Sequence, residues 1–192
     1  TTRGWNLAGS LEYAGGFLGG DNYFWRPEVH LSRFQPISFS PVKTLLALNL
    51  EAGQVIPFDG REVVPLERYY MGGENSIRGF QFRSIYVTDE VTGLPVLQDG
   101  YFKGGDKFIQ MNVELQVLIG GPFRVILFAD GGNVYDDDQS IDISRLRTSA
   151  GGELRIFVPI FGAPLRFIYS SNLDPQPLDR FESFQFSIGA TF

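Results

Sequence analysis

The sequence contains 192 residues, of which 43% are hydrophobic and 15% aromatic, and it carries 23 glycines and a formal net charge of −6. This length suits one domain, and aromatic residues combined with many glycines favour strands and turns over helices. The acidic balance argues against nucleic acid as a partner, because phosphate binding requires a basic face. No cysteine is present and His30 is the only histidine, so we expect neither a metal nor another cofactor.

Hydrophobic and polar residues alternate along most of the chain, which predicts strands. The stretch FIQMNVELQVL at 108–118 is the clearest case, since every second residue is polar from Gln110 to Gln116. No apolar run approaches the roughly 20 residues of a membrane helix. We predict eight strands, at residues 5–14, 22–33, 44–54, 108–118, 124–134, 147–158, 165–172 and 184–192.

The connections between these strands differ in length from one end of the predicted sheet to the other. Residues 119–123 and 159–164 form tight turns, whereas 135–146 and 173–183 form long polar loops. Short turns at one end and long loops at the other are typical of an antiparallel transmembrane β-barrel. The alternative is a soluble sandwich or lipocalin-like barrel, in which the same alternation buries the apolar face inward. Aromatic residues near strand ends fit the girdle of a membrane barrel: Tyr13, Tyr23, Trp25, Tyr169, Phe184 and Phe192.

The connection at 55–106 is far longer than the roughly 12–15 residues expected of a loop without structure. It is rich in aliphatic and aromatic residues, so we expect it to fold onto the barrel interior. A tight tip at Gly79 would carry Arg78 inward, where a buried arginine needs carboxylate partners. Glu114 and Asp130 are the candidates, because both lie on predicted strands that follow the loop. The alternative is that each acid faces water in a lumen.

Three stretches, RYYMGGENSIRGFQF at 68–82, LFADGGNVYD at 127–136 and FQFSIGATF at 184–192, occur in this order. Together they resemble the BamA/TamA superfamily of outer-membrane assembly and translocation proteins, also called the bacterial surface antigen family. The first resembles its Arg-Gly-Phe loop, the second a strand that ends in Asp-x-Gly-x-Val-Tyr, and the third its terminal strand. The resemblance extends over residues 1–192.

The resemblance implies a sixteen-stranded barrel preceded by periplasmic POTRA repeats. The chain would supply the C-terminal half of that barrel as one domain of about eight strands, with no POTRA segment. The loop at 55–106 would fold into the lumen, with Arg78 meeting Glu114 and Asp130, Gly79 forming the tip and Phe80 packing beside it. The terminal strand would form one side of a seam through Phe184, Phe186, Ile188 and Phe192. The alternatives are a fragment of a larger barrel, a half that pairs with another half, and a small self-closed barrel with the loop outside.

The resemblance also implies a location in the bacterial outer membrane and a role as an assembly factor that folds and inserts other β-barrels. The alternatives are a TamA-like or two-partner-secretion transporter and a small structural barrel. An enzyme is not expected, since no G-x-S-x-G motif or Ser-His-Asp set is present. The partners expected are outer-membrane lipids and lipopolysaccharide, unfolded outer-membrane proteins, assembly lipoproteins, and a second barrel half or copy.

Overall fold

A computed structural model describes residues 3–39, 42–158 and 162–189. It confirms the prediction of an all-β antiparallel fold, in which eight strands follow one another in a single sheet. The strands are β1 (Gly4–Ala14), β2 (Phe24–Phe39), β3 (Val42–Gln54), β7 (Lys107–Gly120), β8 (Phe123–Tyr135), β9 (Arg147–Phe157), β10 (Pro164–Asn172) and β11 (Phe184–Ile188). The two-residue β4 (Ile56–Pro57) pairs with β2, and β5 (Leu97–Gln98) pairs with β6 (Tyr101–Phe102) in a separate hairpin.

The strands agree with the predicted segments to within two residues at every boundary except two. β2 continues to Phe39, six residues beyond the predicted segment, and β3 begins at Val42. β11 ends at Ile188, and Phe192, which we predicted to end this strand, lies outside the described residues. Three short 3-10 turns, η1 (Gly16–Leu18), η2 (Pro65–Glu67) and η3 (Ile143–Arg145), lie in the long connections. No helix in the described part of the chain is long and apolar enough to cross a bilayer.

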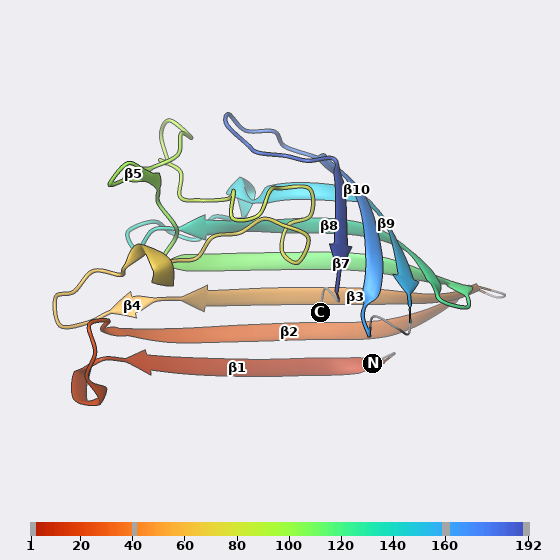
Figure 1. Cartoon of the computed structure of the whole chain (residues 1–192), viewed down its shortest axis with the longest axis horizontal. Coiled ribbons are helices and arrows are strands. Elements are labelled where there is room, and N and C mark those ends of the chain that lie inside the picture. The colour runs from red at the N-terminus through yellow and green to blue at the C-terminus, as the bar shows by residue number, and fades with distance from the viewer. Residues whose placement is uncertain (1–2, 40–41, 159–161, 190–192) are drawn as a thin grey trace.

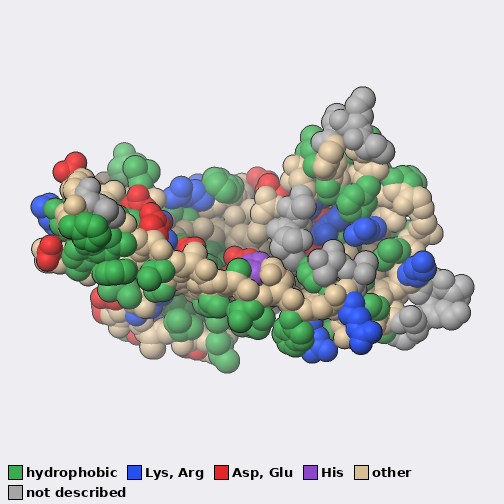
Figure 2. Space-filling view, turned by 90° about the horizontal axis from the view of Figure 1, so that it is seen from below, with side chains coloured by type: hydrophobic (Ala, Val, Ile, Leu, Met, Phe, Trp, Pro, Cys, Tyr) green, Lys and Arg blue, Asp and Glu red, His purple; other side chains and the backbone are tan. Residues whose placement is uncertain are grey.

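The two faces of the sheet differ in polarity in the way a membrane barrel requires. Along β7, Asn112 and Glu114 are buried, whereas Met111 and Val113 are exposed on the opposite face. Near the centre of Figure 2, hydrophobic side chains gather along the lower margin, while the histidine and the acidic side chains beside it lie above them. The apolar residues therefore point outward and the polar residues inward, which is the reverse of a soluble barrel.

The sheet curls around the connection at 55–106, which lies against its inner face (Figure 1). Strand twist accumulates along the sheet, so β9 to β11 run steeply across β1 to β3 in this view. The main apolar core lies between the loop and the wall, not between two sheets. It contains Met71, Ile77, Phe80, Ile85 and Val87 from the loop and Val134 from β8.

The strand path has two ends, β1 and β11, and no pairing joins them among the described residues. β1 pairs with β2 along all 11 of its residues. β11 contains only 5 residues and pairs with β10 alone. The terminal strand is therefore the most weakly paired element of the sheet path.

We expect Val113→Arg to destabilise the folded protein in lipid by about 2–4 kcal/mol, because it places a charge near the middle of the outward face. Val113 is 41% exposed and lies between Leu48 of β3 and Ala129 of β8. The measurement is the free energy of unfolding from lipid vesicles in urea. Ile119→Arg, near the tight turn after β7, is the matched control and should cost at most about 1 kcal/mol. Equal costs for the two variants would contradict an outward face in contact with lipid.

Candidate functional site

The tip of the long loop depends on a glycine. Gly79 has a φ of +89°, a conformation that L side chains rarely adopt. A Cβ atom here would lie 2.3 Å from Cζ of Phe181 and 2.4 Å from Oγ of Ser170. The next residue, Phe80, is fully buried and meets the Phe181 ring edge-on at a centroid distance of 5.2 Å. The tight turn and this packing place the side chain of Arg78 against the wall.

Arg78 is fully buried, and its guanidinium contacts acids on three neighbouring strands. Its Nε and one terminal nitrogen donate to the two carboxylate oxygens of Asp130, each at 2.7 Å. The other terminal nitrogen donates to Glu114 at 2.7 Å and to Glu153 at 2.9 Å. The backbone N–H of Arg78 also donates to Asp130, at 3.1 Å. Such bidentate, charge-assisted bonds fix the direction of the side chain as well as its charge.

Two further arginines extend the Arg78 cluster along β9 and β10. Arg155 donates to Glu114 at 2.7 Å and to Glu153 at 2.5 Å. Arg166 donates to Glu153 at 2.7 Å and reaches back to the loop, where it donates to Asn75 at 2.8 Å and to the carbonyl of Glu74 at 2.9 Å. We call Arg78, Glu114, Asp130, Glu153, Arg155 and Arg166 the arginine cluster.

The arginine cluster is electrically balanced. Its three arginines offset its three carboxylates, and all six side chains are buried. Burial opposes the charged form of Arg78, but the hydrogen bond with Asp130 and the charges of Asp130, Glu114 and Glu153 raise its pKa above the ordinary value. The Arg78 guanidinium also lies 3.7 Å from the centroid of the Phe128 ring. Arg78 therefore stays protonated although its side chain is fully buried, because its partners replace the lost solvation.

The structure brings together Arg78, Glu114 and Asp130, the three residues that the sequence placed in one site. Sequence reasoning missed Glu153, Arg155 and Arg166. A signal was present, since Arg155 and Arg166 each lie on a predicted strand between two apolar residues, and Glu153 lies between Gly152 and Leu154. Charged residues at the middle of such strands must face the interior and find partners there. What the sequence did not provide was the register that aligns β9 and β10 with β8.

A second ion cluster joins Arg68 of the long loop to the C-terminal end of the loop and to the end of β8. Arg68, near the start of the loop, donates to Asp106, the residue before β7, at 2.8 Å. Lys103 pairs with Asp136, which follows β8. Burial raises the pKa of the Asp106 carboxyl to about 6, whereas Arg68 acts in the opposite direction. The loop is thus fixed at its base as well as at its tip.

Three of the four residues that we predicted for the seam lie on β11 and face outward. Phe184, Phe186 and Ile188 are 60%, 54% and 56% exposed. Phe186 contacts Phe167 of β10 at a ring-centroid distance of 5.2 Å, whereas the alternate residue Gln185 points toward the loop tip. Phe192 lies outside the described residues.

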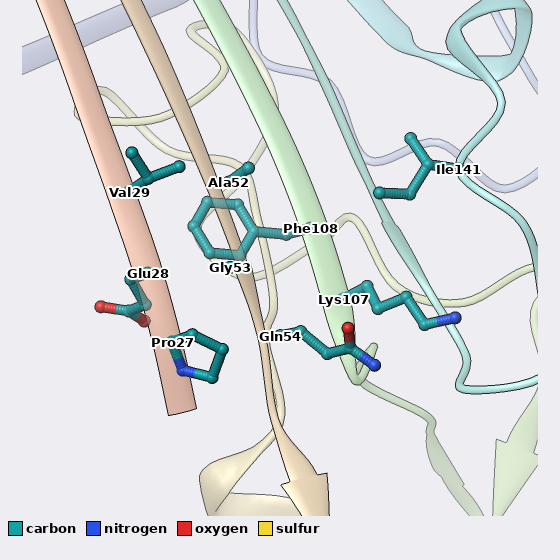
Figure 3. Close-up of a pocket in the computed structure, with 9 residues that line it drawn as sticks. All are labelled: Pro27, Glu28, Val29, Ala52, Gly53, Gln54, Lys107, Phe108 and Ile141. Carbon is teal, nitrogen blue, oxygen red and sulfur yellow. The ribbon is translucent and has the colours of Figure 1, made fainter. Parts of the chain in front are cut away.

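The described residues show no group of three or more acidic or histidine side chains placed to hold a metal ion. A groove of about 300 Å³ lies near the long-loop ends of β2, β3 and β7 (Figure 3). Its two charged residues are already engaged, since Glu28 accepts from the Tyr69 hydroxyl at 2.8 Å and Lys107 donates to the carbonyl of Asp137 at 2.6 Å. The groove therefore offers no set of reactive groups.

An antiparallel wall with an apolar outer face, a buried polar inner face and a loop fixed inside by an arginine defines an outer-membrane type of β-barrel. A model described as the Omp85 superfamily domain matches residues 1–192. The chain therefore belongs to the Omp85 superfamily, which confirms the resemblance found in the sequence.

Curated relatives and solved structures are consistent with this membership. An outer membrane protein assembly factor BamA from Nitratidesulfovibrio vulgaris is 30% identical over 190 residues, which cover 94% of this chain and 22% of that protein. The sorting and assembly machinery component 50 homolog A of Xenopus laevis is 26% identical over 144 residues, covering 68% of this chain and 28% of that protein. The crystal structure of BamA from Haemophilus ducreyi lacking POTRA domains 1–3 matches 96% of this chain and 38% of that chain, with a TM-score of 0.74 and 24% identity, a likeness that concerns the fold.

The chain spans about a fifth of the length of the curated bacterial relative with 30% identity. Its family, its relatives and its outward apolar face place it in the bacterial outer membrane, in contact with lipid. The bacterial relative is named as an outer membrane protein assembly factor, and the Xenopus relative as a component of a sorting and assembly machinery.

We expect Arg78→Ala to reduce the free energy of unfolding by about 3–5 kcal/mol, because it leaves the buried Asp130 without its arginine and removes one of the two arginines that pair with Glu114. The measurement is urea unfolding in detergent or lipid, followed by the change in gel mobility between folded and heated samples. Arg83→Ala is the matched control in the same loop, since Arg83 is exposed and only stacks on Tyr70, 4.3 Å from the ring centroid. A cost below about 1 kcal/mol for Arg78→Ala would show that the cluster does not stabilise the fold.

We expect Gly79→Ala to be more destabilising than Gly93→Ala by about 1–3 kcal/mol. Both glycines have positive φ, +89° and +68°, so both substitutions strain the backbone. Only Gly79 has neighbours within 4 Å of the added Cβ atom. The difference between the two unfolding free energies therefore measures the close packing at the tip, and equal values would argue against it.

Proposed function

We propose that the protein containing this chain is an outer-membrane protein assembly factor that folds other β-barrels and inserts them into the outer membrane. The chain supplies part of the barrel wall, and the loop at 55–106 acts as an internal brace. Membership of the Omp85 superfamily and relatives named as assembly factors support this role. The observation that carries it is a strongly fixed loop tip beside a terminal strand of only 5 residues.

The mechanism that we propose depends on the contrast between these two elements. The arginine cluster joins the loop to β7, β8 and β9, so this side of the barrel remains closed and rigid. β11 offers one unpaired edge and few hydrogen bonds to β10. An unfolded strand of a substrate protein would add to this edge through backbone hydrogen bonds, as in other cases of strand addition.

The partners follow from this mechanism. Unfolded outer-membrane proteins are the substrates, and lipid and lipopolysaccharide surround the outward face. Assembly lipoproteins and a second barrel half or copy are further partners that we propose. Among the described residues, β1 and β11 each have an unpaired edge. Open edges are not tolerated in lipid, which supports a second half that completes the wall and meets β11 at a seam that substrate strands could open.

The alternative within the superfamily is transport, as in TamA-like or two-partner-secretion proteins, and a structural barrel is a third role. We prefer assembly because the curated relatives from bacteria and from Xenopus are both named for assembly. We found no set of reactive side chains among the described residues that would favour an enzyme over these roles.

Arg78→Lys tests this function in cells that depend on the variant for outer-membrane assembly. Lysine keeps the charge but loses the bidentate fork, so we expect at least a severalfold loss of folded substrate barrels. The measurement is the folded fraction of other barrel proteins, recorded together with the amount of folded variant. Arg83→Lys is the control and should sustain normal assembly. Normal assembly by a folded Arg78→Lys protein would contradict the brace, and normal outer membranes after removal of the whole protein would contradict the assembly role.

A further inference from the structure

Gln185, on the terminal strand, contacts the loop tip and does not belong to the arginine cluster. Its Oε1 accepts a hydrogen bond from the backbone N–H of Gly79 at 2.7 Å. Its Nε2 donates to the backbone carbonyl of Phe80 at 3.1 Å. A single side-chain amide thus binds both the donor and the acceptor of the loop tip, as the backbone of a neighbouring strand would.

This contact continues a short stretch of backbone pairing between the tip and the segment before β11. Phe80 and Phe181 form an antiparallel bridge. The N–H of Glu182 donates to the carbonyl of Gly79 at 2.6 Å, and the N–H of Gln81 donates to the carbonyl of Arg180 at 2.9 Å. The loop tip therefore acts as an additional pairing partner for the chain segment that leads into β11.

The pairing of β11 with the wall is otherwise limited. β11 has 5 residues, whereas the other strands of the sheet path have between 9 and 16. Its register with β10 runs from Leu165 opposite Ile188 to Tyr169 opposite Phe184. Two side-chain hydrogen bonds to the tip are thus a large addition to the bonds that hold this strand.

The residues at the tip are consecutive, so the two anchors cannot move independently. Arg78 is fixed to β7, β8 and β9 through Glu114, Asp130 and Glu153. Gly79 and Phe80, the next two residues, are held by Gln185 on β11. The rigid side of the wall is therefore connected to the terminal strand through three residues of the loop, in addition to the pairing through β10.

We propose that Gln185 is a positioning residue that couples the opening of the terminal strand to the state of the loop tip. Release of the tip removes two hydrogen bonds from β11, and separation of β11 exposes the backbone of Gly79 and Phe80. This inference deepens the proposed function. Only the idea that strand opening admits a substrate rests on that function. The side-chain contacts given above carry the coupling itself.

Amide hydrogen exchange of the intact protein in lipid nanodiscs tests the coupling without any substrate. In Gln185→Ala we expect exchange at 184–188 and at 79–82 to become about 10- to 30-fold faster, the effect of losing two hydrogen bonds. In Gln185→Glu the acceptor for Gly79 remains, but the donor to Phe80 is lost and a carboxylate oxygen faces the Phe80 carbonyl, so acceleration is again expected at both segments. Exchange in the centre of β7 should stay unchanged, which shows that the acceleration is local.

Two further variants separate coupling from a local loss of contacts. Ser187→Ala is the matched control, because Ser187 also faces inward from β11 but makes only a 3.4 Å contact with Glu74. We expect it to leave both segments within about twofold of the parent protein. Arg78→Lys should accelerate exchange in β11, although the contacts of its guanidinium are with β7, β8 and β9.

Unchanged β11 exchange in Gln185→Ala would overturn the proposal, and so would acceleration at β11 with no change at the tip. Unchanged β11 exchange in a folded Arg78→Lys protein would show that the two anchors are independent and would also overturn it. These results do not depend on assembly activity. If the coupling is observed while the protein fails to support barrel assembly in cells, the proposed function is wrong and the coupling stands.

Discussion

The structure depends on one electrostatic constraint, which is the burial of the Arg78 guanidinium away from water. A buried charge of this kind is tolerated only when hydrogen-bonding partners of opposite charge replace its solvation. The wall supplies them from three strands, through Glu114, Asp130 and Glu153. Since three acids exceed one arginine, the wall also carries Arg155 and Arg166, and the cluster becomes neutral as a whole. The long loop therefore docks where Arg78 supplies the third arginine of the cluster and balances its three carboxylates.

The same constraint explains why the strands carry polar residues at their buried positions. A soluble barrel would fill its interior with the apolar residues of each strand, and the arginine would have no partners there. Here the apolar residues face lipid, so the inner face is free to carry charges and amides, as it does along β7 from Gln110 to Gln116. The apolar core is provided by the loop itself, through residues such as Ile77 and Phe80 that pack against Val134. One loop thus supplies both the hydrophobic filling and the charge that orients it.

The fold could be predicted from the sequence because the alternation of apolar and polar residues is a local property. It is visible in each strand without knowledge of the neighbouring strands. The loop and its arginine could be predicted as well, since a segment of this length and composition must pack on something and its charge must be paired. Glu153 and Arg166 were missed because their contacts depend on how β9 and β10 align with β8, and register is a nonlocal property. Gln185 was missed for a related reason. Its amide is one of several polar side chains that face inward, and only the position of the loop tip makes it a partner of Gly79 and Phe80.

The arrangement reconciles two demands that conflict in a barrel with an open edge. A strand that separates easily must form few hydrogen bonds with its neighbour, yet an edge that separates without control would expose its backbone to lipid. In this wall the short pairing of β11 with β10 meets the first demand. Contacts with a loop that is anchored elsewhere meet the second, because they hold β11 without lengthening its pairing with the wall. These contacts use one side-chain amide and a few backbone groups, so they can be broken one at a time. The ion pairs of the neighbouring arginine cluster remain intact while this happens.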